Sequence, residues 1–277
     1  MSAAALPYTT LILLVELALG SLLVVTAFDA RSMVTRGYVQ MGALVVAPTL
    51  LLAFFLARSL QPGVEVDGYT LNSGSFAPFR IALIIFLVIS VGHGLAAFAG
   101  HRGASVGLGV AGSLVGLVAV GLLAAVVSPP AWSYIGVLVS MLAGAFALGG
   151  SLMAMSWGHW YLTNSGLPKE PLEQMSLFLA VVLAVQCVLL VVGLVAPVRE
   201  APLSDVSMGV SLAANPALWL RAGVGLAFPL VLAWLAYKAA SIRGMMSATG
   251  LLYIATGAVL AGEILARGLL FATGIAL

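Results

Sequence analysis

The chain has 277 residues, of which 62% are hydrophobic and only 7% are charged. A soluble domain carries roughly 25% charged residues, so this composition cannot cover a water-facing surface and indicates an integral membrane protein. The net charge of +2, from 11 Lys and Arg against 9 Asp and Glu, leaves no basic surface of the kind that binds nucleic acid.

Eight apolar runs are each long enough to cross the membrane, since a helix of about 20 residues spans a hydrocarbon core about 30 Å thick. Only helices and closed barrels satisfy their backbone groups in lipid, and runs of this length do not alternate as barrel strands do. We therefore predict an all-α polytopic integral membrane protein, a bundle of about eight transmembrane helices with short loops forming one domain (1–277). The spans are expected near residues 9–28, 39–57, 80–99, 104–127, 134–157, 175–196, 217–237 and 247–274.

The basic residues between the spans predict the orientation, because cytoplasmic loops are enriched in Lys and Arg. Placing the N-terminus outside puts the larger group of basic residues inside. We therefore expect a multi-pass protein of the cytoplasmic (inner) membrane with both termini on the outer side. The inside residues are then Arg31, Arg36, Arg102, Lys169, Lys238 and Arg243, and the outside ones are Arg58, Arg80 and Arg199.

Four charged residues lie clearly within the expected spans, away from their ends: Glu16 in the first, Arg221 in the seventh, and Glu263 and Arg267 in the last. Glu263 and Arg267 are four residues apart and share one helix face. Both glutamates fall just outside the bilayer midplane, and the two arginines fall about one turn further out. We therefore expect one buried layer if the first, seventh and eighth helices are neighbours. Two interpretations remain open: a charge-balanced clamp between helices, or a relay for protons or ions.

His93 lies in the third span between Gly92 and Gly94, which leaves room for a bulky group beside its ring. A b-type haem usually needs two imidazoles on facing helices. His159 could be the second ligand only if the fifth helix continues past Trp157 and the two rings reach similar depth. Haem b is therefore the less favoured cofactor, and a hydrogen bond between helices is the alternative for His93.

Small residues form a stripe on the fourth and fifth spans, and such stripes let helix backbones approach closely in membranes. We expect these two helices to pack against each other, with contact to another subunit as the alternative. The residues are Ser105, Gly109, Gly112 and Gly116 on the fourth span, and Gly136, Ser140 and Gly144 on the fifth.

The segment at the cytoplasmic end of the fifth span contains Trp157, His159, Trp160 and Tyr161. Trp and Tyr gather at membrane interfaces, so an aromatic belt explains three of them. His159 also suits a quinone headgroup, since an imidazole offers a hydrogen-bond donor among stacking rings. A pocket shared by all of them requires the helix to unwind near Gly158 or the imidazole to face the bundle interior, because neighbouring positions point in different directions.

Two further residues limit the chemistry. Pro229 is expected to kink the seventh helix and to free a backbone carbonyl. Cys187 is the single cysteine, so the chain has no internal disulfide and no Cys-based zinc or iron–sulfur site, and we predict no metal site. Motifs of nucleotide-driven or hydrolytic chemistry are absent from the sequence.

The overall layout, with short loops and few charges, resembles in a general way the membrane-anchor subunits of bacterial respiratory complexes. That resemblance implies a subunit that docks partner proteins and binds quinone, without being catalytic alone. A proton-coupled secondary transporter is an alternative, supported by Glu16, Glu263 and Pro229, although we find no repeat of the kind such transporters contain. A structural or assembly subunit with no ligand is the third hypothesis.

Overall fold

The computed structural model describes residues 3–164, 166–196 and 215–276, and these form eight helices long and apolar enough to cross a membrane. The predicted helical bundle is thus confirmed at that level. The first six spans are α1 (Ala5–Ala30), α2 (Arg36–Ser59), α3 (Phe76–Ala99), α4 (Arg102–Val127), α5 (Tyr134–Thr163) and α6 (Glu170–Val195). The seventh consists of α7 (Pro216–Leu220), η3 (Arg221–Ala227) and α8 (Phe228–Ser241), and the eighth is α9 (Met245–Thr273).

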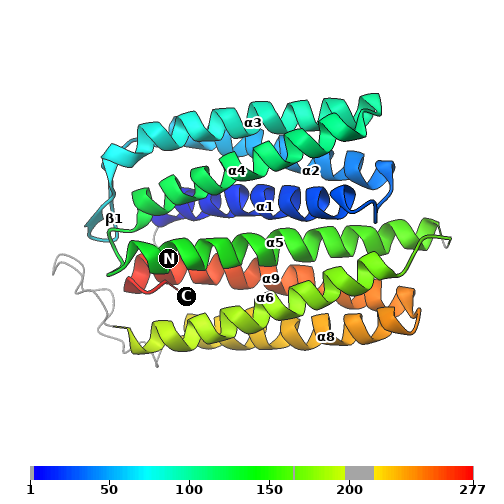
Figure 1. Ribbon diagram of the computed structural model, residues 1–277. Coiled ribbons are helices and arrows are strands. Elements are labelled where there is room, and N and C mark those ends of the chain that lie inside the picture. The colour runs from blue at the N-terminus through cyan, green and yellow to red at the C-terminus, as the bar shows by residue number, and fades with distance from the viewer. Residues whose placement is uncertain (1–2, 165, 197–214, 277) are drawn as a thin grey trace.

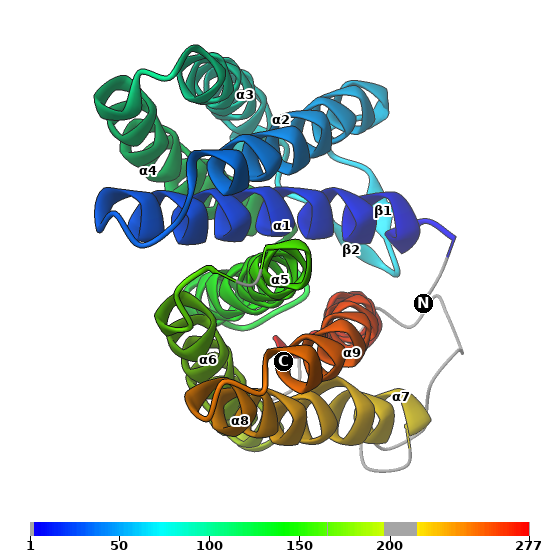
Figure 2. The ribbon, with the colours of Figure 1, turned by 90° about the vertical axis from the view of Figure 1, so that its right-hand side faces the viewer.

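The helices form two groups of four that lie side by side (Figure 2). The first bundle consists of α1 to α4, and the second consists of α5, α6, the seventh span and α9. Each of the two clusters of buried apolar side chains contains residues from both bundles. Helices α1 and α5 lie at the contact between the bundles. Each also contacts the last helix of the other bundle, because α1 packs on α9 and α5 packs on α4. The two bundles therefore contain the same order of helices running in the same directions, a structural repeat that we did not find in the sequence.

Both described ends of the chain lie at one end of the molecule (Figure 1). The longest described connection lies there too, with a two-stranded hairpin of β1 (Glu65–Val66) and β2 (Tyr69–Thr70) and a short turn, η1 (Ser73–Ser75). The opposite end holds the short turns after α1, α3, α5 and α8. We call it the basic end, because it carries Arg31, Arg36, Arg102, Lys169, Lys238 and Arg243. Arg199 lies outside the described residues.

The contact between the bundles depends on glycine. A Cβ atom at Gly20 of α1 would lie 1.8 Å from the carbonyl oxygen of Ala145 on α5, and one at Gly149 would lie 2.0 Å from the carbonyl carbon of Gly20. No side chain fits between backbones this close, so only glycine permits the crossing. The two helices thus pack backbone against backbone.

The small residues of α4 pack elsewhere than expected. Gly109 lies against Thr26 of α1, and Gly116 lies against Leu19 of the same helix. The prediction that the α4 stripe would meet α5 is therefore wrong. The stripe faces α1 because α4 packs against both α3 and α1, which closes the first bundle of four helices.

Directly before Pro229, where we expected a kink, the seventh span has an altered hydrogen-bond pattern. Residues Arg221–Ala227 form a π-helix, in which the amide of Phe228 donates to the carbonyl of Gly223, five residues earlier. Proline has no N–H with which to bond the carbonyl four residues before it, and a π-turn shifts the hydrogen-bond pattern by one residue. The span therefore continues past Pro229, and Arg221 stands at the first turn of the altered segment.

Candidate functional site

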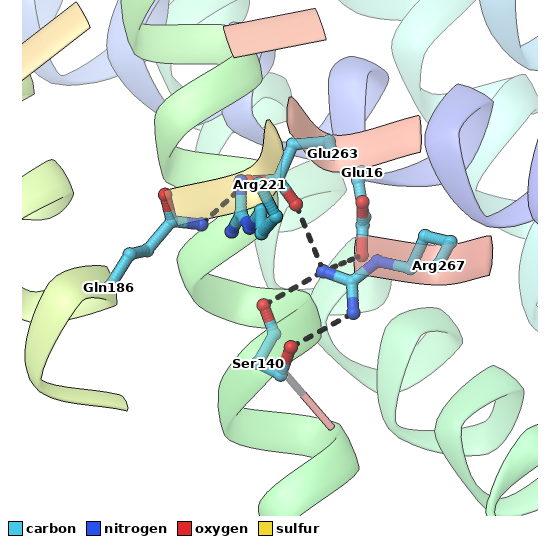
Figure 3. A network of polar contacts seen from close by, with 6 residues as sticks. All are labelled: Glu16, Ser140, Gln186, Arg221, Glu263 and Arg267. Carbon is cyan, nitrogen blue, oxygen red and sulfur yellow. Dashed lines mark hydrogen bonds and ion pairs between the residues drawn. The ribbon is translucent and has the colours of Figure 1, made fainter. Parts of the chain in front are cut away.

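A network of charged side chains lies inside the protein between the two bundles (Figure 3). It joins Glu16 of α1, Arg221 of η3, and Glu263 and Arg267 of α9, and none of the four side chains is more than 1% exposed. The structure thus brings together the four charged residues that the sequence placed in one layer. We call them, with Ser140 and Gln186, the buried charge network.

Arg267 is the centre of this network. Its Nη2 atom lies 3.1 Å from Oε1 of Glu16 and 3.2 Å from Oε2 of Glu263. The same guanidinium donates from Nη1 to the Ser140 hydroxyl at 2.9 Å and from Nη2 to the Ser140 carbonyl at 3.0 Å. One arginine therefore holds acceptors from α1, α5 and α9, and so from both bundles.

The two carboxylates have different surroundings. Glu263 forms an ion pair with Arg267 and another with Arg221, whose Nη2 lies 3.1 Å from Oε1, and it accepts a hydrogen bond of 2.7 Å from Nε2 of Gln186. Glu16 has the ion pair with Arg267, and its Oε2 has no hydrogen-bond partner among the described residues. Glu263 is therefore the firmly held carboxylate and Glu16 the loosely held one.

Glycines make the room that this network needs. A Cβ atom at Gly144 of α5 would lie 2.6 Å from Nη2 of Arg267 and 2.7 Å from Oε2 of Glu263. A Cβ atom at Gly225 would lie 2.5 Å from the Cα of Gly262, so the π-segment and α9 also touch through glycine. The small stripe on α5 thus makes space for charged side chains, whereas we expected it to pack against α4.

The charges in the network balance, but the hydrogen bonds are incomplete. The charges of the two carboxylates and the two guanidinium groups sum to zero, and this balance lowers the cost of burying them away from water. Yet Nε of Arg267, Nε and Nη1 of Arg221, and Oε1 of Gln186 have no protein partner among the described residues. The network can therefore act as a clamp between the bundles, and it also has hydrogen-bonding capacity that the described protein atoms do not use.

Two members of the network were not identified from the sequence as site residues. Ser140 was interpreted only as a small packing residue. Gln186 was passed over, although an amide within the apolar run of α6 is unusual and could have signalled a buried polar partner.

His159 lies on an exposed face of α5, where its Nδ1 atom is 2.8 Å from the hydroxyl of Tyr253 on α9. The two rings meet edge to face, with centroids 6.2 Å apart. Tyr253 is 45% exposed, so the His159–Tyr253 pair lies on the outer surface of the protein. Tyr253 was not predicted, because a single tyrosine in a span has no distinctive pattern around it.

The aromatic residues around His159 do not form one pocket with it. Helix α5 runs without a break to Thr163, because Gly158 packs tightly on α9, where a Cβ atom would lie 2.5 Å from the Thr249 hydroxyl. Trp157 is fully buried and meets the ring of Tyr38 edge to face at 5.1 Å. The unwinding that a shared pocket required is therefore absent from this described segment.

Trp160 and Tyr161, the other two aromatics of this segment, are half-buried. A Cβ atom at Gly37 would lie 2.7 Å from the indole of Trp160, so this ring covers the start of α2. Trp157 and Trp160 thus pack against different residues and do not line a pocket with His159.

His93 is buried in the first bundle. Its Nδ1 atom lies 2.9 Å from the carbonyl oxygen of Ser105 on α4, a contact between neighbouring helices of the kind weighed as the alternative to haem. Helix α1 lies between α3 and α5 in both views (Figures 1 and 2), and His159 is on an outer face. The structure therefore does not bring the two imidazoles to one site. Among the described residues no three His, Cys, Asp or Glu side chains are placed to hold a metal ion.

No family model, no curated protein and no solved structure matches this chain. Its function is therefore inferred from its own residues.

Proposed function

We propose that this chain is the membrane-embedded subunit of a respiratory or other redox assembly, in which it anchors partner subunits and binds a quinone headgroup at the His159–Tyr253 pair. The observation that carries this proposal is an imidazole held by a tyrosine on the exposed face of two membrane-spanning helices.

The pair has the chemistry that a quinone oxygen needs. When the Tyr253 hydroxyl donates to Nδ1, the neutral imidazole carries its proton on Nε2 and can donate it as a hydrogen bond. His159 lies four residues before the end of α5, close to the basic end, where an aromatic ring and a polar group suit the membrane interface. A quinone dissolved in the bilayer would reach this face without opening the bundle.

The contact between the bundles favours a static subunit over a transporter. Alternating access in many transporters moves one repeat against the other around a central site. Here α1 and α5 touch through the backbones of Gly20 and Gly149, and the ion pair of Glu16 with Arg267 joins the same two bundles. A rocking motion would have to break both contacts.

The basic residues support the cytoplasmic membrane as the location, with the basic end facing the cytoplasm and both termini outside. The apolar helices support lipid as the direct surroundings. Partner subunits are part of the proposal because quinone chemistry needs a redox centre.

The test is the quinone content of the full-length chain purified with its partners from its own membranes. Quinone is extracted with solvent and counted per chain in the wild type and in His159→Ala and Tyr253→Phe. We expect bound quinone in the wild type, and a loss of most of it in His159→Ala, because the donor is gone. Tyr253→Phe should have an intermediate effect, since it removes only the group that orients the imidazole.

His101→Ala is the matched control, because His101 is an exposed histidine in the turn before α4 at the same end of the protein. It should retain wild-type quinone. The absence of quinone from the intact wild-type assembly would reject the proposal and leave a structural subunit. Solute-driven proton uptake by vesicles that hold the chain alone would instead identify a transporter.

A further inference from the structure

A pocket with a volume of about 280 Å³ opens at the basic end of the first bundle. It lies where the turn between α1 and α2 meets the turn between α3 and α4, and Arg36 and Arg102 are both in its lining. None of its lining residues belongs to the buried charge network or to the His159–Tyr253 pair. It is therefore a separate site.

The two arginines are held in place by backbone carbonyls at helix ends. Arg36 donates from Nε to the carbonyl of Ala97 at 3.0 Å and from Nη2 to the carbonyl of Phe98. Arg102 lies 3.1 Å from the Asp29 carboxylate through Nε, and its Nη2 donates to the Asp29 carbonyl. These contacts cap the C-terminal ends of α3 and α1. They fix both guanidinium groups at the pocket without a ligand.

Each arginine keeps donors to spare. The Nη1 groups of Arg36 and Arg102 have no hydrogen-bond partner among the described residues. Gly100 leaves space beside the first of them, because a Cβ atom there would lie 2.8 Å from Nη1 of Arg36. The pocket thus offers fixed guanidinium donors, which is the group proteins use most to bind phosphate.

The charge of the pocket is positive. Two arginines face one carboxylate, Asp29, which is 5% exposed and already paired with Arg102. Helices α2 and α4 both begin at these arginines, so their N-terminal amides add to the positive potential. The rest of the lining is partly apolar, with Val34, Val39 and Ala97. A ligand that fits therefore has an anionic and an apolar part.

We propose that this pocket binds the phosphate of an anionic phospholipid, with the headgroup on Arg36 and Arg102 and the first part of an acyl chain against Val34 and Val39. The pocket lies where the spans end, which is the depth of lipid headgroups, and basic pockets between transmembrane helices bind anionic lipids elsewhere. Free phosphate shares the charged chemistry but would leave the apolar lining unused. The site does not depend on quinone binding.

The test uses the full-length protein in detergent with defined lipids. Native mass spectrometry counts phosphatidylglycerol or phosphatidylcholine bound to the wild type and to variants. We expect phosphatidylglycerol to bind more tightly than phosphatidylcholine to the wild type. Arg36→Gln and Arg102→Gln should each weaken that binding about tenfold, the loss expected for one charge-assisted hydrogen bond.

A second variant guards against misfolding, because both arginines also cap helices. Val34→Trp fills the pocket and leaves the arginines in place, and it should weaken phosphatidylglycerol binding as strongly. Arg31→Gln is the control, since Arg31 lies at the same end but outside the lining and stacks on the Phe28 ring. It should bind the lipid like the wild type.

Three results would overturn the proposal. One is equal binding of the two lipids to the wild type. Another is unchanged phosphatidylglycerol binding in Val34→Trp and in both arginine variants. The third is displacement of the lipid by millimolar inorganic phosphate, which would assign the pocket to a soluble phosphate compound and reject the lipid.

Discussion

At the scale of single residues, the two buried carboxylates, Glu16 and Glu263, differ in the number of partners that hold them. Glu263 is held by two arginines and an amide, while Glu16 is held by Arg267 alone. Breaking one partner of a buried ion pair is costly because it leaves the other charge uncompensated. Both carboxylates should therefore matter for stability, and to different extents.

The first prediction compares Glu16→Gln with Glu263→Gln, which keep the side-chain shape and remove the charge. Glu16→Gln should destabilise the folded protein by about 3–5 kcal/mol, because Arg267 loses one of its two carboxylates. Glu263→Gln should cost more, because it leaves Arg221 with no carboxylate partner in the network. Thermal unfolding of the purified protein in detergent measures both.

Equal unfolding temperatures for the two variants would contradict the unequal roles. The same variants separate clamp from relay. If the network is only a clamp, folded Glu16→Gln protein keeps its quinone and the activity of its assembly. Loss of activity in a well-folded Glu16→Gln protein would indicate that Glu16 passes a proton.

The second prediction concerns Gly144, whose missing side chain makes room for the network. Gly144→Ala should destabilise the protein by about 1–3 kcal/mol, because the new methyl group overlaps Arg267 and Glu263. Gly107→Ala on α4 is the control, since a Cβ atom there meets nothing within 4 Å. That change should be neutral or should stabilise slightly, as alanine favours helix over glycine. A similar loss in both would show that helix propensity, and not the network, controls the effect.

At the scale of helices, the sequence predicted the spans but not their neighbours. The lipid core fixes the length of an apolar run, so the runs located the helices to within a few residues at most ends. The exception with most effect is α5, which was expected to end at Trp157 and continues to Thr163. Unwinding near Gly158 was a condition for a pocket shared by the aromatic residues and His159, whereas Gly158 is the point where α9 comes close.

The stripes of small residues show the same limit. A stripe indicates that something approaches closely, but it does not say which element. On α4 the approaching helix is α1, and on α5 the space is filled by the side chains of Arg267 and Glu263. The intramembrane charges were easier to interpret, because each is costly in lipid and must find a partner. Gln186 and Tyr253 escaped notice because one neutral polar group carries a weaker signal.

The third prediction tests the contact between α1 and α5 with two adjacent glycines. Gly149→Ala should destabilise the protein by at least about 3 kcal/mol, because the methyl group would overlap the backbone of α1, which cannot move aside alone. A Cβ atom at Gly150 would meet only the Phe178 ring, at 3.1 Å, and this side chain needs to shift by only a few tenths of an ångström. Gly150→Ala should cost less than about 1 kcal/mol. Equal effects on the unfolding temperature would mean that the bundles do not depend on this crossing.

At the scale of the whole molecule, the two bundles place the described ends of the chain opposite the basic end. The structure shows which residues share an end, and the basic residues predict which end faces the cytoplasm. The fourth prediction concerns this orientation.

In a Cys187→Ser background, Thr70→Cys in the hairpin should react with a membrane-impermeant thiol reagent in intact cells or spheroplasts. Ile242→Cys, which is 82% exposed in the turn after α8, should react only after the membrane is opened. The reverse pattern would place both termini in the cytoplasm.

The ion pair between Glu16 and Arg267 also constrains the order of synthesis. A ribosome makes α1 long before α9, so the Glu16 carboxyl group enters the bilayer while its arginine does not yet exist. Until α9 inserts, the Glu16 side chain has no ion-pair partner in the membrane. The insertion of α1 into the bilayer is therefore less favourable in the growing chain than in the finished protein. The insertion of α9 therefore completes the stabilisation of α1. A chain that stops before α9 would have a less stable α1, which a membrane protease could recognise.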